Sequence, residues 1–187
     1  MKHLPLVLIA LGTQFAAAPG FAAACEGSEQ YLFSCGTADA QGQYRDEGPA
    51  ICGTQTPDGM GWETMRYVYE SEKGVEFSYP PDPHDGKTKL FFHHYFAAGL
   101  YHARVRFENG GFTYQVHFDD TPPSKDPDTV NGPEAGVRVL RHGKVVADIA
   151  CAERPASRFD DIRQGTACDR KNPYGEKACQ PDALELP

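Results

Sequence analysis

The feature that most constrains this chain is a set of six cysteines that follows a leader-like N-terminus. Residues 1–24 begin with the basic Lys2, continue with an apolar run at 4–11 and end in small residues that include Ala22 and Ala24. This order is typical of a secretory signal peptide, with cleavage after Ala24. A secreted or periplasmic chain meets an oxidising environment, so we expect its even number of cysteines to form disulfides.

The start of the mature chain raises the question of a membrane anchor. The apolar run has about eight residues, whereas a membrane-spanning helix needs about twenty, so we predict no transmembrane segment. The sequence Ala-Ala-Ala-Cys that ends at Cys25 resembles a bacterial lipobox, but Ala22 stands where a lipobox usually has Leu. A lipid on Cys25 would also leave an odd number of thiols. We therefore predict a periplasmic or secreted chain without a lipid anchor.

Spacing alone leaves most of the disulfide connectivity open, because six cysteines allow fifteen pairings. The cysteines are Cys25, Cys35, Cys52, Cys151, Cys168 and Cys179. A bond between Cys168 and Cys179 is favoured, since they bracket a short segment rich in turn residues. Cys151 ends a predicted strand and needs a distant partner among the first three cysteines.

Size and charge narrow the class of protein. The 187 residues less the 24-residue leader leave 163, which is within the range of one domain. The formal net charge is −8, and it becomes −9 when Lys2 is removed with the leader. This charge argues against nucleic-acid partners and anionic membrane surfaces. It is compatible with a basic protein partner, or simply with solubility.

Short apolar segments separated by Gly- and Pro-rich turns run through most of the mature chain. They predict an all-β fold, a single antiparallel β-barrel or β-sandwich at 25–152. The strand pattern stops after Cys151, and 157–164 has the character of a short helix with Ser157 as its N-cap. We therefore expect a C-terminal extension at 153–187, with a short helix and loop clasped by the disulfide Cys168–Cys179.

The clearest predicted element is a hairpin at 101–119. Asn109-Gly110 is a strong signal for a two-residue turn, and both arms alternate between apolar and polar residues. With that turn, residues whose numbers add up to 219 lie opposite each other, so that Phe107 meets Phe112. The apolar residues of both arms then share one face.

The opposite, polar face of this hairpin is the best candidate for a binding surface. It carries His102, Arg104, Arg106, Gln115 and His117. In the predicted register His102 lies opposite His117, and a cross-strand histidine pair can hold Zn²⁺ or Cu²⁺. His93 and Asp119 are the further ligands of this alternative, whereas the two arginines would repel a cation. The aromatic stretch 91–101 is a second candidate surface.

No catalytic motif is recognisable: the chain has no G-x-S-x-G elbow, no H-E-x-x-H and no Walker A sequence. We therefore expect a non-catalytic, disulfide-stabilised binding protein without a cofactor, such as an inhibitor or immunity protein against a cell-envelope enzyme. A carrier of a small apolar ligand and a metal-binding protein that uses His102 and His117 are the alternatives. In architecture alone, a cysteine-closed periplasmic β-domain resembles the bacterial inhibitors of lysozyme, although this chain lacks their Ser-Gly-x-Gly-type loop.

Overall fold

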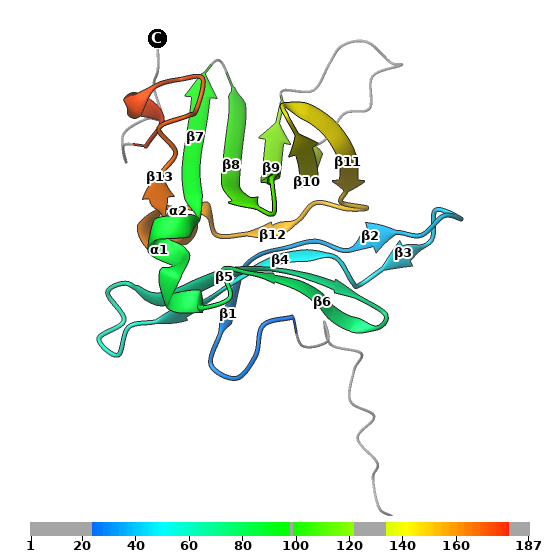
Figure 1. The fold of residues 1–187 in the computed structure, drawn as a ribbon, viewed down its shortest axis with the longest axis horizontal. Coiled ribbons are helices and arrows are strands. Elements are labelled where there is room, and N and C mark those ends of the chain that lie inside the picture. The colour runs from blue at the N-terminus through cyan, green and yellow to red at the C-terminus, as the bar shows by residue number, and fades with distance from the viewer. Residues whose placement is uncertain (1–23, 98, 122–133, 180–187) are drawn as a thin grey trace, which may run out of the picture.

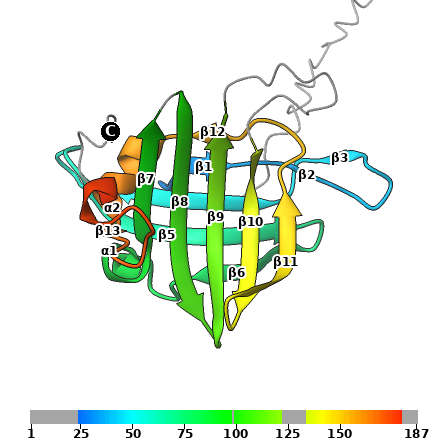
Figure 2. The same ribbon diagram turned by 90° about the horizontal axis from the view of Figure 1, so that it is seen from above.

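Two β-sheets packed face to face make up the fold, and their strands cross at a steep angle (Figures 1 and 2). The computed structural model describes residues 24–97, 99–121 and 134–179. The predicted all-β class is confirmed, and within these ranges the two sheets form a sandwich that does not close into a barrel. The predicted signal peptide lies almost wholly outside the described residues.

The lower sheet in Figure 1 is five-stranded and antiparallel. Its strands, in spatial order, are β12 (Ala156–Ser157), β1 (Gln30–Ser34), β4 (Pro49–Gln55), β5 (Trp62–Ser71) and β6 (Gly74–Tyr79). A separate small hairpin pairs β2 (Thr37–Ala38) with β3 (Tyr44–Arg45).

The upper sheet is six-stranded and carries the predicted hairpin at its centre. Its strands, in spatial order, are β11 (Lys144–Ala150), β10 (Glu134–Arg141), β9 (Phe112–Asp120), β8 (Leu100–Asn109), β7 (Phe91–Ala97) and β13 (Ala167–Cys168). The neighbours are antiparallel except β13, which adds to β7 as a short parallel edge strand.

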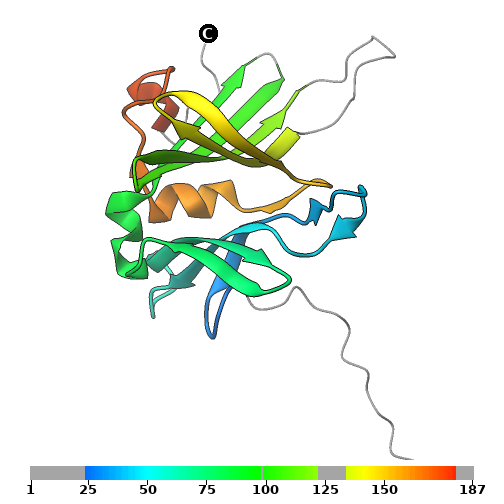
Figure 3. The ribbon, with the colours of Figure 1, turned by 45° about the vertical axis from the view of Figure 1, so that its right-hand side comes forward.

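Four short helical segments complete the described chain: η1 (Pro83–Asp85), α1 (Gly86–Lys89), α2 (Phe159–Gly165) and η2 (Glu176–Cys179). The predicted short helix is confirmed as α2, but its N-cap is Arg158. Ser157 is instead the last residue of β12, because its backbone pairs with Phe33 of β1. In Figure 3, α2 lies at one end of the molecule between the two sheets.

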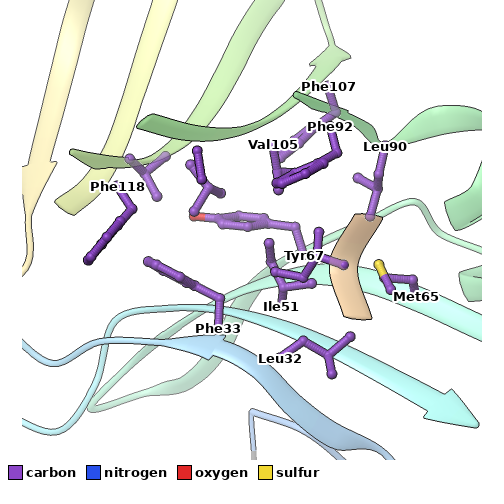
Figure 4. Packing of buried hydrophobic residues seen from close by; sticks show 14 of the residues in the cluster. Leu32, Phe33, Ile51, Met65, Tyr67, Leu90, Phe92, Val105, Phe107 and Phe118 are labelled. Atoms are coloured by element: carbon purple, nitrogen blue, oxygen red, sulfur yellow. The ribbon is translucent and has the colours of Figure 1, made fainter. Parts of the chain in front are cut away.

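Aromatic side chains from both sheets fill the space between them (Figure 4). The rings of Tyr67 on β5 and Phe107 on β8 lie 5.1 Å apart, and Tyr79 stacks on Phe107 at 4.7 Å. Ile162 of α2 is fully buried in the same cluster, so the segment after residue 152 contributes to the core. Each large side chain buried in this way contributes about 1.5–3 kcal/mol to stability.

The register of the β8–β9 hairpin differs from the prediction by two residues. Asn109 pairs with Phe112, and the turn residues are Gly110 and Gly111, whose φ angles are 57° and 81°. A two-residue hairpin turn of type I′ needs positive φ at both positions, which two glycines adopt without strain. The predicted pairing of Phe107 with Phe112 is therefore wrong, and Phe107 pairs with Tyr114. An even shift keeps the same side chains on the core face, as predicted.

Three disulfides join Cys25 to Cys52, Cys35 to Cys151, and Cys168 to Cys179. The predicted clasp between Cys168 and Cys179 is confirmed, and the distant partner of Cys151 is Cys35. The bond to Cys52 uses the Cys25 sulfur that a lipid anchor would require. Three such bonds are consistent with an extracellular or periplasmic location. Within the described ranges, the helices are too short and too polar to span a bilayer.

Candidate functional site

The candidate site is the outer face of the six-stranded sheet, which we call the polar face. Figure 2 looks onto it. Because side chains alternate along a strand, every second residue of β7, β8 and β9 points away from the core. From these three strands it carries His93, Tyr95, His102, Arg104, Arg106, Gln115, His117 and Asp119.

Its centre is a cluster of His102, Arg104 and Asp119. Asp119 lies directly opposite His102 in the hairpin, and its carboxylate contacts His102 Nδ1. Arg104 Nη2 donates to the same carboxylate at 2.8 Å, while Arg104 Nη1 donates to the backbone carbonyl of Ala103 at 2.9 Å. Burial alone would raise the pKa of Asp119, but the His102 hydrogen bond and the Arg104 charge hold it below its ordinary value. The carboxylate therefore fixes a histidine and an arginine in place.

His117 lies opposite Arg104, so the predicted cross-strand pair of His102 and His117 is wrong. The turn lies one residue later than predicted, which shifts the pairing by two residues and brings Asp119 to the place opposite His102. The His117 side chain is 3% exposed, and its Nδ1 has no hydrogen-bond partner in the part of the chain that is described. Burial, together with the charges of Arg138 and Arg104, lowers its pKa to about 4. His117 is therefore neutral at neutral pH.

The ligands predicted for a metal ion do not converge. Across β7, β8 and β9, Arg104 stands between His93 and His117 in one row of paired residues. His102 and Asp119 belong to the next row of paired residues. The Arg104 side chain reaches across from its own row and binds the Asp119 carboxylate. Among the described residues, no three His, Cys, Asp or Glu side chains are grouped to hold a metal ion.

A second cluster links the polar face to the C-terminal segment. Asp169 accepts hydrogen bonds from Arg106 Nε at 2.9 Å and Nη2 at 2.8 Å, and both side chains are more than nine-tenths buried. Arg106 Nη1 also donates to Glu108 at 2.9 Å, and His93 Nδ1 lies 3.5 Å from Asp169. Burial would raise the pKa of Asp169, but the nearby His93 imidazole and the hydrogen bonds from Arg106 hold this pKa far below its ordinary value.

The same segment places a second aromatic ring over β7. Tyr174 stacks on Tyr95 with ring centroids 4.2 Å apart, and the Asn172 side chain holds the loop by donating to the Gly175 carbonyl at 2.9 Å. Sequence reasoning included Tyr95 only as part of an aromatic stretch and missed Tyr174 and Asp169. The positions of Tyr174 and Asp169 depend on the parallel pairing of β13 with β7. β13 has two residues, which is too short for an alternating pattern that would predict a strand.

The chain matches no family model, no curated protein and no solved structure. The chemistry of the polar face must therefore be inferred from its geometry. Arginine, histidine and tyrosine side chains are held there by buried carboxylates and by stacking. Such groups suit the recognition of carboxylates, carbonyls and aromatic rings on a partner.

Proposed function

We propose that the chain is a non-catalytic binding protein of the periplasm or extracellular space, and that the polar face contacts its partner. The class that fits best is an inhibitor or immunity protein that acts on a cell-envelope enzyme. The observation that carries this proposal is the cluster of His102, Arg104 and Asp119. It presents two donor side chains in fixed positions beside the stacked pair of Tyr95 and Tyr174.

Preorganisation makes this cluster suitable for binding a protein. An exposed arginine loses side-chain entropy when a partner immobilises it, but Arg104 is already held by Asp119 and the Ala103 carbonyl. Arginine and tyrosine are also among the residues that most often dominate the binding energy of protein interfaces. The net charge of −8 would in addition attract a basic partner over long range at low salt.

The two alternatives have less support. A carrier of an apolar ligand needs space, whereas the region between the sheets is packed with aromatic side chains (Figure 4). A metal-binding protein that uses His102 and His117 would have to displace Arg104 from Asp119.

The test is affinity capture with the full chain, its disulfides intact, followed by an activity assay. Envelope extract of the encoding organism is passed over the wild type, Arg104→Ala and the control Arg154→Ala. Arg154 suits the control because it is exposed and pairs with Asp120, whose side chain lies on the face of β9 opposite to that of Asp119. We expect the wild type and the control to retain one envelope hydrolase that Arg104→Ala loses. The purified hydrolase should lose activity on peptidoglycan when the wild-type chain is added. Equal capture by all three proteins, or an unaffected enzyme, would contradict the proposal.

A further inference from the structure

A pocket of about 710 Å³ opens at the edge of the six-stranded sheet, where α1, β7 and β13 meet. We propose that it is a second binding site, which takes a small organic anion with a flat apolar body. The side chains that decide this chemistry are Tyr79, Lys89, Phe91, Arg106, Arg170 and Lys171. The site is separate from the centre of the polar face, so the inference goes beyond the function proposed above.

The excess of positive side chains around the pocket indicates that the ligand is an anion. Among the described residues, four cationic side chains line the pocket together with one carboxylate, that of Glu108, in a chain whose net charge is −8. Lys171 Nζ pairs with Glu108 at 2.8 Å, and Lys89 Nζ pairs with Asp85 at 3.0 Å. Each ammonium group has three donors, so hydrogen-bonding capacity remains on both after these contacts.

Arg170 provides the excess positive charge. Asp169 and Glu108 already bind the guanidinium of Arg106, but no described residue forms an ion pair with Arg170. An incoming carboxylate or phosphate would therefore meet an available guanidinium beside the Lys171 ammonium. Charge-assisted hydrogen bonds of this kind are about twice as strong as neutral ones.

The apolar wall indicates that the ligand is more than a bare anion. The Arg106 guanidinium lies 4.9 Å above the centre of the Phe91 ring, and Tyr79 contributes a second aromatic side chain. The disulfide-bonded Cys168 and the neighbouring Ala167 extend this wall. A few charged groups at the side of an apolar surface are typical of small-molecule sites, where the apolar part supplies affinity and the charges fix orientation.

Close packing on one side, and strand pairing with a disulfide on the other, fix the shape of the pocket. A Cβ atom on Gly86 would lie 2.2 Å from the backbone oxygen of Met65, so α1 sits directly against β5. On the other side, β13 is fixed to β7 by backbone pairing and to η2 by the disulfide Cys168–Cys179. A ligand would therefore enter a largely preformed site and would have little ordering free energy to overcome.

Phenyl phosphate is the first probe, with inorganic phosphate, benzyl alcohol and benzylamine as matched comparisons. Each is titrated into the isotopically labelled full chain while amide resonances are followed. We expect phenyl phosphate to saturate and to shift the amides of 88–91 and 167–171. Inorganic phosphate and benzyl alcohol should bind at least about tenfold more weakly. Benzyl alcohol or benzylamine binding as tightly as phenyl phosphate would overturn the proposal, and so would the lack of saturation by phenyl phosphate at about 10 mM.

A charge-removing variant provides the second arm. Arg170→Gln combined with Lys171→Gln removes two exposed cations, and we expect phenyl phosphate affinity to fall at least about tenfold. Exposed ion pairs contribute little to stability, so the melting temperature should stay close to that of the wild type. The control Arg154→Gln removes an exposed arginine away from the pocket and should bind like the wild type. Unchanged affinity in the double variant would overturn the assignment, whatever partner the polar face binds.

Discussion

Asp169 accepts two hydrogen bonds from Arg106, although the two residues are 63 positions apart in the chain. The contact joins the C-terminal segment to the central strand β8 and lies at the boundary between the polar face and the pocket formed by α1, β7 and β13. Because both side chains are more than nine-tenths buried, each is the main counter-ion of the other.

Removing this carboxylate should destabilise the fold strongly. Asp169→Ala leaves the buried Arg106 charge with Glu108 as its one remaining ion-pair partner among the described residues, and breaking a buried pair in this way costs about 3–5 kcal/mol. The measurement is the free energy of unfolding in urea with the disulfides intact. Asp160→Ala is the matched control, since the Asp160 side chain is 89% exposed, and it should change stability by less than about 0.5 kcal/mol. A similar decrease in the free energy of unfolding of both variants would show that the buried ion pair stabilises the fold no more than an exposed carboxylate does.

His117 should make the fold less stable as the solution becomes acidic. Its pKa is about 4 in the folded chain against an ordinary value of 6.5, so between these values the unfolded chain binds more protons. Above pH 6.5 the neutral His117 therefore costs no stability. As the pH falls from 6.5 towards 4, the free energy of unfolding should decrease by about 2–3 kcal/mol. His117→Gln, which cannot titrate, should flatten the dependence of unfolding free energy on pH across this window. An NMR titration that gives His117 a pKa near 6.5 would refute the prediction.

The three disulfides should differ in how much they stabilise the fold. In the chain-entropy model a bond contributes more when it closes a longer loop. Cys35 and Cys151 are separated by 116 positions, and replacing both by Ala should cost about 5 kcal/mol. Cys168 and Cys179 are separated by 11, and the same change there should cost about 3 kcal/mol. Denaturant unfolding of the two double variants measures both values, and the reverse order would be the contrary result.

Gly86 should resist replacement although it lies in a helix. Its φ of −51° suits alanine, which is the better helix former, so propensity alone predicts a more stable protein. The added Cβ would instead lie 2.2 Å from the Met65 carbonyl oxygen, and relieving that clash should cost about 1–3 kcal/mol. Gly61→Ala is the control, because its Cβ would come no nearer than 3.8 Å to a neighbour. Thermal unfolding measures the outcome: Gly86→Ala should lower the melting temperature if the clash outweighs helix propensity, whereas Gly61→Ala should leave it nearly unchanged.

Alternation of apolar and polar residues was sufficient to predict the all-β class and the core face of β8 and β9. That signal has a period of two, so it cannot distinguish a turn at Asn109-Gly110 from one at Gly110-Gly111. The choice between them decides whether His102 meets His117 or Asp119, and hence whether the polar face resembles a metal site. The pairing of Arg106 with Asp169 depends on a chain reversal through α2 and β13, which no local pattern encodes.

The disulfide between Cys25 and Cys52 encloses Cys35, whose partner Cys151 is made much later in synthesis. During synthesis from the N-terminus, Cys25, Cys35 and Cys52 are exposed to oxidants first. Cys151 follows Cys52 by 99 residues. If neighbouring thiols react in order of appearance, Cys35 is captured by Cys25 or Cys52, and the native pairs must then form by exchange. Because the pairs Cys25–Cys52 and Cys35–Cys151 interleave along the sequence, we expect maturation of this protein to depend on a disulfide isomerase or on delayed oxidation, unlike that of a chain whose pairs are consecutive.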